Sequence, residues 1–286
     1  MGFMDFDSRY GKYFEPIPDV AMYLERIGLA GEEIPLSKAG LDKLQTAHLF
    51  SIPFENIDLW DYNKTVDYGI MDLWDKIILR KRGGYCFELN ALYMALLQAL
   101  GFDAYAVGAR TVTNERRDVD PPYMHRMTVV TIGDKRYVTD VGFGFTNAAR
   151  ISICLDEYGE QDICGYMHTV EDMPDDVKLV IGHSEHRPPM IFKFTARPLP
   201  ILDFIGPNYF MSAVGFRFKR IANLHTPDGG LSVDGAVFRE TRNGEISETP
   251  AATAQQTYKI LTERYGMILN EPLLEQAELK DPPPPF

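Results

Sequence analysis

The chain is poor in cysteine. Three cysteines occur among its 286 residues, Cys86, Cys154 and Cys164, and no pair has the spacing of a redox or zinc motif. An odd count without paired spacing indicates neither a disulfide framework nor a zinc knuckle, and it fits the reducing cytoplasm. The histidines show no consistent ligand spacing, and the one close pair, His183 and His186, is most simply a loop. We therefore predict no bound metal.

Positive charge is also scarce. The chain has 29 Lys and Arg against 41 Asp and Glu, which gives a net charge of −12 and a pI of about 5.0. Nucleic acids and anionic membranes both need a basic surface, so neither is an expected partner. No run of about 18 apolar residues is present to span a bilayer. The first residues lack the regions of a signal peptide, and Phe6 stands where a myristoylation motif needs Ser or Thr. We expect a soluble, cytoplasmic, globular protein, and a homo-oligomer stays open.

One of the three cysteines is placed for chemistry. Cys86 follows the glycines of Arg82-Gly-Gly-Tyr-Cys-Phe-Glu-Leu-Asn90 and precedes apolar residues at helical spacing, namely Leu89, Leu92, Tyr93, Leu96, Leu97 and Leu100. This pattern predicts a helix that begins at or beside Cys86 and stops at Gly101. Unpaired amides and the helix dipole at such a start favour the reactive thiolate. A buried core cysteine is the structural alternative.

A second segment supplies a histidine and a carboxylate. His125 to Ile132 and Arg136 to Val141 are β-branched runs separated by Gly133-Asp134-Lys135. If Gly133 and Asp134 are the two turn residues, His125 and Asp140 share one face of the hairpin as diagonal neighbours. One further turn residue would place them on opposite faces. Taken singly, each residue is more simply explained by a structural role, His125 as a hydrogen-bonded structural histidine and Asp140 as a turn former at the end of a strand.

Together, the three residue types provide what acyl transfer through a thioester requires. A cysteine needs a base or a positive field to become a thiolate near neutral pH, and a histidine needs a third group to fix its tautomer. Cys86, His125 and Asp140 provide nucleophile, base and orienting carboxylate. These residue types alone leave the acceptor open, whether water or another molecule.

With these residues in place, the sequence resembles the arylamine N-acetyltransferase family of the bacterial type. The resemblance rests on four blocks in the family's order across the first half of the chain: Leu44-Gln45 with His48 and Ser51-Ile-Pro-Phe-Glu-Asn56, the stretch from Arg82 to Asn90, Pro121-Pro122 with His125, and Tyr137-Val-Thr-Asp-Val-Gly-Phe-Gly144. It continues more weakly through Asp203-Phe204, Asn208-Tyr209 and Thr226-Pro-Asp-Gly229.

The resemblance implies an activity. The enzyme would be an acyltransferase that moves an acetyl group from acetyl-CoA, its cosubstrate, to an arylamine, arylhydrazine or N-hydroxyarylamine. The implied route is ping-pong through an acetyl-cysteine, with Cys86, His125 and Asp140 as the catalytic triad and a thiol nucleophile. A role in xenobiotic metabolism follows from the same likeness.

The resemblance also implies contacts to the two substrates. Phe54 and Phe143 match positions that flank the bound amine, and stacking on each ring would contribute about 0.5 to 1.5 kcal/mol. Met124 stands where bacterial relatives often carry a Thr that reaches the coenzyme, and it has no hydroxyl to donate. The run from Ser212 to Phe218 also departs from the family pattern. Coenzyme phosphates would need local cations, for which Arg80-Lys81-Arg82 and Arg217, Lys219 and Arg220 are candidates.

For the fold, the resemblance implies an α+β protein with a cysteine-protease-like triad. Residues 1–102 are expected as a helical bundle carrying the nucleophile helix, 103–200 as a β-barrel-like domain carrying His125 and Asp140, and 201–286 as an α/β lid with a late helix and a proline-rich tail. The change from helical to strand periodicity near residue 102 supports this division independently. Helices are expected near Pro18, Ser37 and Ile70, at Cys86, and from Ala252 to Tyr265.

Two other functions stay open. The same triad serves a thioester or amide hydrolase, or an amide synthase, in which water or a tethered amine is the acceptor. A non-catalytic binding protein with this fold is the second alternative, favoured by Met124 and the altered run from Ser212. Glu55 and Arg82 are expected to pair and hold the cysteine loop.

Overall fold

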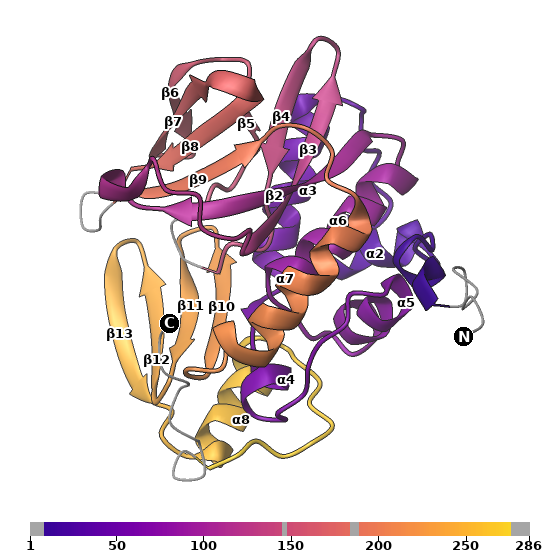
Figure 1. Ribbon diagram of the computed structural model, residues 1–286. Coiled ribbons are helices and arrows are strands. Elements are labelled where there is room, and N and C mark those ends of the chain that lie inside the picture. The colour runs from indigo at the N-terminus through magenta and orange to yellow at the C-terminus, as the bar shows by residue number, and fades with distance from the viewer. Residues whose placement is uncertain (1–8, 145–147, 184–188, 276–286) are drawn as a thin grey trace, which may run out of the picture.

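The computed structural model describes residues 9–144, 148–183 and 189–275. It is an α+β fold in which helices from the first third of the chain lie against an eight-stranded sheet, with a five-stranded sheet beside it (Figure 1). The expected α+β class and the barrel-like sheet are therefore confirmed.

Two of the N-terminal helices, α2 and α3, begin after residues whose side chains cap them. The side chain of Asp19 accepts a hydrogen bond from the Met22 amide at 3.0 Å, and Ser37 does the same for the Gly40 amide at 3.3 Å. The helices of this region are η1 (Gly11–Tyr13), α2 (Val20–Arg26), α3 (Lys38–Ser51), α4 (Ile57–Trp60), α5 (Ile70–Leu73), η2 (Trp74–Leu79) and α6 (Cys86–Ala99). Most of the α6 side chains are buried, as expected for a leucine-rich central helix.

The helix expected near Ile70 differs from a regular α-helix. After the four residues of α5, η2 continues as a π-helix. The wider π turn changes which side chains face inward, and Lys76 is only 5% exposed. An apolar period of 3.6 residues does not reveal such a shift.

The eight-stranded sheet is nearly closed. Its strands are antiparallel in the order β5-β4-β3-β2-β9-β8-β7-β6. The side chain of Gln161 on β6 bonds both the amide and the carbonyl of Cys154 on β5, at 3.0 and 2.7 Å, so the two edges meet. The strands are β2 (Asp103–Val112), β3 (His125–Ile132), β4 (Lys135–Thr139), β5 (Ile153–Cys154), β6 (Gly159–Ile163), β7 (Tyr166–Met173), β8 (Val177–Gly182) and β9 (Met190–Thr195), with short helices η3 (Asn114–Arg116) and η4 (Pro174–Asp176) between them.

The second sheet combines distant parts of the chain. Strand β1, only Phe54–Glu55, pairs with β10, and the order continues β11-β12-β13. Its other strands are β10 (Ile221–Thr226), β11 (Gly229–Asp234), β12 (Val237–Arg242) and β13 (Glu245–Pro250). The helices of this last third of the chain are η5 (Ile201–Phe204), α7 (Ile205–Phe210), the π-helix η6 (Met211–Gly215) and α8 (Ala254–Arg264). Figure 1 shows η5 and α7 crossing in front of the α6 region, with α8 beneath the second sheet.

The predicted late helix begins two residues later than expected, because Thr253 caps it by accepting from the Gln256 amide at 3.1 Å. It ends at Arg264, one residue before the predicted end. The division of the chain at residues 102 and 200 stays a prediction. The proline-rich run at 282–286 lies outside the described residues.

Candidate active site

Cys86 is the first residue of α6 and is 1% exposed. The predicted helix start is thus confirmed. The helix ends just before Gly101, as predicted, and Gly101 has the positive φ of 98° that is common after the end of a helix. The approach to Cys86 requires glycine, because a Cβ on Gly83 would lie 1.8 Å from the Pro53 carbonyl oxygen. The Cys86 Sγ lies 3.8 Å from the Met124 carbonyl oxygen, to which the sulfur could donate only in its thiol form.

The hairpin adopts the predicted register. Ile132 pairs with Lys135, so Gly133 and Asp134 form the two-residue turn, and Thr128 pairs with Thr139. β4 ends at Thr139, two residues before the predicted end, which leaves Asp140 just beyond the strand. The His125 Nε2 and the Asp140 Oδ2 are 2.6 Å apart. The diagonal pairing expected from period-2 alternation is therefore present.

Asn90 joins the helix to this pair, although the sequence analysis gave it no role. Its Nδ2 donates to the Asp140 Oδ1 at 2.8 Å and to the Arg126 carbonyl at 2.6 Å, and its Oδ1 accepts from the Val141 amide at 3.1 Å. Asn90 lies four residues after Cys86, one turn along the same face of α6. That spacing was the available signal for finding it.

The positive charge of the site is carried by the imidazole of His125. Burial alone lowers the pKa of its imidazole, but the Asp140 carboxylate and the Cys86 sulfur outweigh burial and raise the pKa of His125 to about 10. Since Nε2 faces Asp140, Nδ1 is the ring nitrogen left for the sulfur. His125 therefore carries its proton at neutral pH, with the positive charge between a carboxylate and a cysteine.

Four aromatic rings surround the histidine and the helix start. Phe192 stacks on the His125 ring with centroids 4.9 Å apart at 19°, and the Phe143 ring meets it edge-on at 6.3 Å. Phe54 packs edge-on against Phe216 at 5.7 Å. Sequence reasoning singled out Phe54 and Phe143 but missed Phe192 and Phe216, which come from β9 and from the segment after η6.

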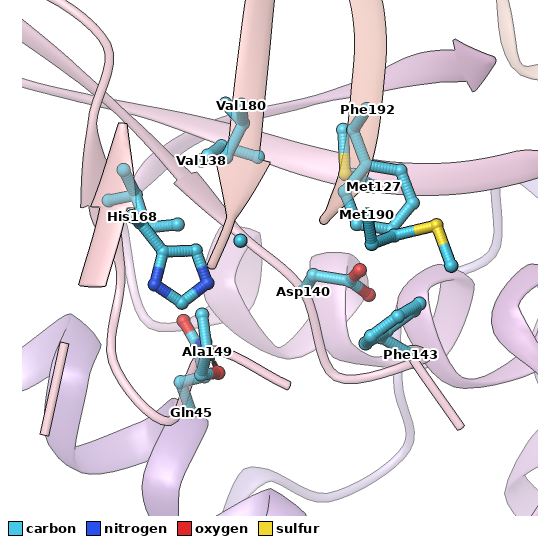
Figure 2. Close-up of a pocket in the computed structure, with 12 residues that line it drawn as sticks. Gln45, Met127, Val138, Asp140, Phe143, Ala149, His168, Val180, Met190 and Phe192 are labelled. Carbon is cyan, nitrogen blue, oxygen red and sulfur yellow. Dashed lines mark hydrogen bonds between the residues drawn. The ribbon is translucent and has the colours of Figure 1, made fainter. Parts of the chain in front are cut away.

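A small cavity lies beside this group. Its volume is about 40 Å³, and its walls are mainly apolar, with Asp140, Phe143 and Phe192 on one side and the His168 ring on another (Figure 2). Burial lowers the pKa of His168, and its Nδ1 lies 3.1 Å from the Tyr166 carbonyl oxygen. A space of this size is large enough to hold bound water.

Two of the cations suggested as partners of the coenzyme phosphates form buried ion pairs with carboxylates of the protein. Arg82 is 2% exposed and bonds Glu55, with Nη2 and Oε1 2.7 Å apart, which confirms the expected pair. Arg220 is fully buried against Asp61. Both guanidinium groups were candidates for the coenzyme phosphates, and the sequence did not indicate their burial, because a run of basic residues does not reveal which side chains face inward.

The described part of the chain contains no cluster of three or more His, Cys, Asp or Glu side chains suited to a metal ion. Within the same residues, no helix has the length and apolar character required to cross a membrane.

The geometry defines a class of chemistry. A cysteine at a helix start, a charged imidazole beside it and a carboxylate bonded to that imidazole are the groups that thiol-based acyl transfer uses. Residues 39–274 match the family model described as N-acetyltransferase. The arylamine N-acetyltransferase of Mycolicibacterium smegmatis is 29% identical over 260 residues, covering 88% of this chain and 93% of that protein.

Solved structures agree with this match. The arylamine N-acetyltransferase of M. tuberculosis superposes with a TM-score of 0.78 at 28% identity, covering 87% of this chain and 94% of the other. That of Mycobacterium marinum, solved in complex with CoA, has the same fold, with a TM-score of 0.78 at 24% identity over 91% of this chain and 97% of the other. The chain belongs to the arylamine N-acetyltransferase family, whose members are acyltransferases.

Proposed function

We propose that the protein transfers an acetyl group from acetyl-CoA to an arylamine, arylhydrazine or N-hydroxyarylamine by a ping-pong mechanism through acetylated Cys86. The observation that carries the proposal is the convergence of Cys86, His125 and Asp140 at the start of α6. Family membership supports the choice of substrates, and the CoA complex of the M. marinum relative supports CoA as the carrier of the donor.

In the first half-reaction, His125 has already taken the proton of Cys86. The thiolate attacks the carbonyl carbon of the acetyl thioester and forms a tetrahedral intermediate. When that intermediate collapses, the bond from carbon to the CoA sulfur breaks, and the imidazolium protonates the departing CoA thiolate. Cys86 is left acetylated and His125 neutral.

In the second half-reaction, the amine attacks the acetyl-cysteine carbonyl while neutral His125 accepts the amine proton. The bond from carbon to the Cys86 sulfur then breaks, which releases the amide and restores the pair of thiolate and imidazolium. Asp140 stabilises the positive ring in both halves through the 2.6 Å contact to Nε2. Asn90 and the Gly142 amide, which both bond the Asp140 Oδ1 at 2.8 Å, hold the carboxylate in place.

Aromatic rings are proposed to select the acceptor. Phe54 and Phe143 would bind a flat apolar amine through stacking and desolvation. Met124 is the residue proposed to lie against the coenzyme, where its side chain offers no hydrogen-bond donor. The cytoplasmic location and the role in xenobiotic metabolism remain proposals that rest on the family.

Intact-mass measurement after mixing with acetyl-CoA tests the proposal directly. The wild-type protein should gain one acetyl group on Cys86, and an aniline-type or hydrazine acceptor should remove it. Cys86→Ala should abolish both labelling and turnover, whereas Cys154→Ala is the matched control because Cys154 is also buried and should retain labelling. Stable, unlabelled wild-type protein would refute the mechanism.

The effect of added amine on the loss of the acetyl group distinguishes a transferase from the main alternative. A hydrolase or amide synthase with the same three residues would lose its acetyl group at a rate independent of added amine. Acceleration by the amine supports the transferase. A binding protein without catalysis would show no selective alkylation of Cys86 by iodoacetamide relative to Cys154 and Cys164.

A further inference from the structure

A buried group of charges lies directly beneath the start of α6. It comprises three carboxyl groups, from Glu55, Asp58 and Glu88, and two cations, from Lys76 and Arg82. The Lys76 Nζ lies 2.7 Å from the Glu88 Oε1, 2.7 Å from the Asp58 Oδ2 and 4.0 Å from the Glu55 Oε1. Arg82 bonds Glu55 and Asp58. The group thus holds one more carboxyl than cations.

Glu88 connects this group to the backbone amide of the residue before Cys86. Its Oε2 accepts a hydrogen bond from the Tyr85 amide at 3.1 Å, while its Oε1 accepts from Lys76. Tyr85 is the residue immediately before Cys86, and Glu88 lies two residues after it. A Cβ on Gly84 would lie 2.7 Å from the Glu88 Oε2, so the chain is closely packed on this carboxyl.

We propose that Glu88, held by Lys76, is a positioning residue that fixes the Gly84–Tyr85 peptide, next to Cys86, and so the direction in which the Cys86 side chain points from the start of α6. The inference rests on the proposed acetyl-carrier function of Cys86. Lys76 reaches this position because it lies on the π-helix η2. Only an ionised carboxylate serves both contacts well, since each oxygen must accept a hydrogen bond.

The charge state of Glu88 depends on its surroundings. It faces Lys76 from η2, Asp58 from α4, Glu55 from β1 and the hydroxyl of Tyr85, with Arg82 bonded to the two other acids. Burial is the largest influence and, against the lowering effect of Lys76, raises the pKa of Glu88 to about 7. Below that pH the carboxyl is protonated, so one of its oxygens becomes a hydroxyl donor. That hydroxyl then faces a second donor, either the Lys76 ammonium or the Tyr85 amide, and one of the two hydrogen bonds is lost.

Glu88→Gln tests the inference because Gln reproduces the protonated form. Its carbonyl can accept from Tyr85, but its NH₂ group then faces the ammonium of Lys76. We expect the rate of Cys86 acetylation in the wild type to rise as the pH passes about 7, and the Gln variant to lack that rise and to react about tenfold more slowly at about pH 8. Single-turnover acetylation over this range is the measurement.

Two further variants separate positioning from general stability. Lys76→Met in the Glu88→Gln background removes the clash of donors and should restore a large part of the lost rate. Asp172→Asn is the matched control, since it removes a carboxylate bonded to a buried lysine, Lys178, at 2.8 Å in the barrel. That control should retain the wild-type rate and pH profile.

The unfolding free energy provides a second measurement. Because the pKa of Glu88 is about 7 in the folded protein against 4.5 for an ordinary Glu, the folded state binds the extra proton, and stability from this group falls as the pH rises from about 4.5 to about 7. Glu88→Gln should remove this slope.

If the Gln variant keeps both the wild-type rate and the rise near pH 7, or is slower at every pH with the rise retained, Glu88 does not position the nucleophile. The same profile measured with iodoacetamide tests positioning even if wild-type Cys86 accepts no acetyl group, so the failure of the proposed function is recognised separately.

Discussion

At the scale of single residues, the His125 ring is held from three directions. Asp140 bonds Nε2, Phe192 covers one face and the Phe143 ring meets it edge-on. A ring fixed in this way has one orientation toward the sulfur and, whenever it is neutral, one favoured tautomer, which would reduce the reorganisation needed at each proton transfer. The pKa of about 10 means that the ring rests in its charged form.

Asp140→Asn tests the charge argument. The amide keeps the shape but cannot stabilise imidazolium, so we expect the pKa of His125 to fall and acetyl transfer to drop by about 10²-fold or more. Because the folded pKa of His125 is raised from 6.5, its stabilising contribution is full below about pH 6.5 and is lost as the pH rises through about 10. The variant should show a flatter dependence of stability on pH over that window in urea titrations. Asp156→Asn, which removes a partner of Arg136 instead, is the control and should leave transfer intact.

At the scale of elements, the segment after β4 is packed directly on α6. A Cβ on Gly142 would lie 2.6 Å from the Cys86 Cα and 2.7 Å from the Asn90 Nδ2. The hairpin that carries Asp140 and the helix that carries Cys86 are thus set against each other by close backbone contact as well as by hydrogen bonds. Glycine here allows the two elements to approach.

Gly142→Ala should therefore separate the elements. We expect the added methyl group to displace the segment after β4 by a fraction of an ångström or more and to reduce the rate of acetyl transfer by about 10²-fold. The free energy of unfolding should fall by a smaller proportion than the rate. Gly206→Ala is the control, because a Cβ there meets nothing within 4 Å. Equal transfer rates for the two variants would show that the contact does not set the geometry.

At the scale of the whole molecule, a buried ion pair connects the first and last thirds of the chain. Arg220 and Asp61 have fully buried side chains. The guanidinium also donates to the Thr257 hydroxyl at 3.2 Å and to the Leu274 carbonyl at 2.8 Å. One side chain thus joins the end of α4, the start of β10, α8 and the segment that follows α8.

Arg220→Met should leave Asp61 as an unpaired buried acid. The expected cost is about 3–5 kcal/mol of unfolding free energy, measured by urea denaturation. The double variant with Asp61→Leu removes both charges and should recover most of that loss. A single variant as stable as the wild type would show that the pair makes no net contribution.

Prediction from sequence succeeded where the physical rule is local. The glycine pair and the leucine spacing located the start of α6, and a two-residue turn with period-2 alternation located His125 beside Asp140. It failed where a contact depends on distant strands. Nothing near Phe192 in the chain indicates that its ring will cover His125, because alternation assigns a side chain to a face without naming what lies opposite.

The sequence by itself indicated the cysteine at the start of α6, the two-residue turn that sets the hairpin register and, through its motifs, the family, since these depend on neighbours within a turn or a hairpin. Only the tertiary structure decided that Lys76 and Arg220 are buried in ion pairs and that Arg82 bonds Asp58 as well as the expected Glu55, because a charged side chain is expected at the surface until its partner is placed. The same holds for the aromatic enclosure of His125 and for the carboxyl of Glu88 beneath Cys86. Their environment is created by packing between elements that lie far apart in the chain.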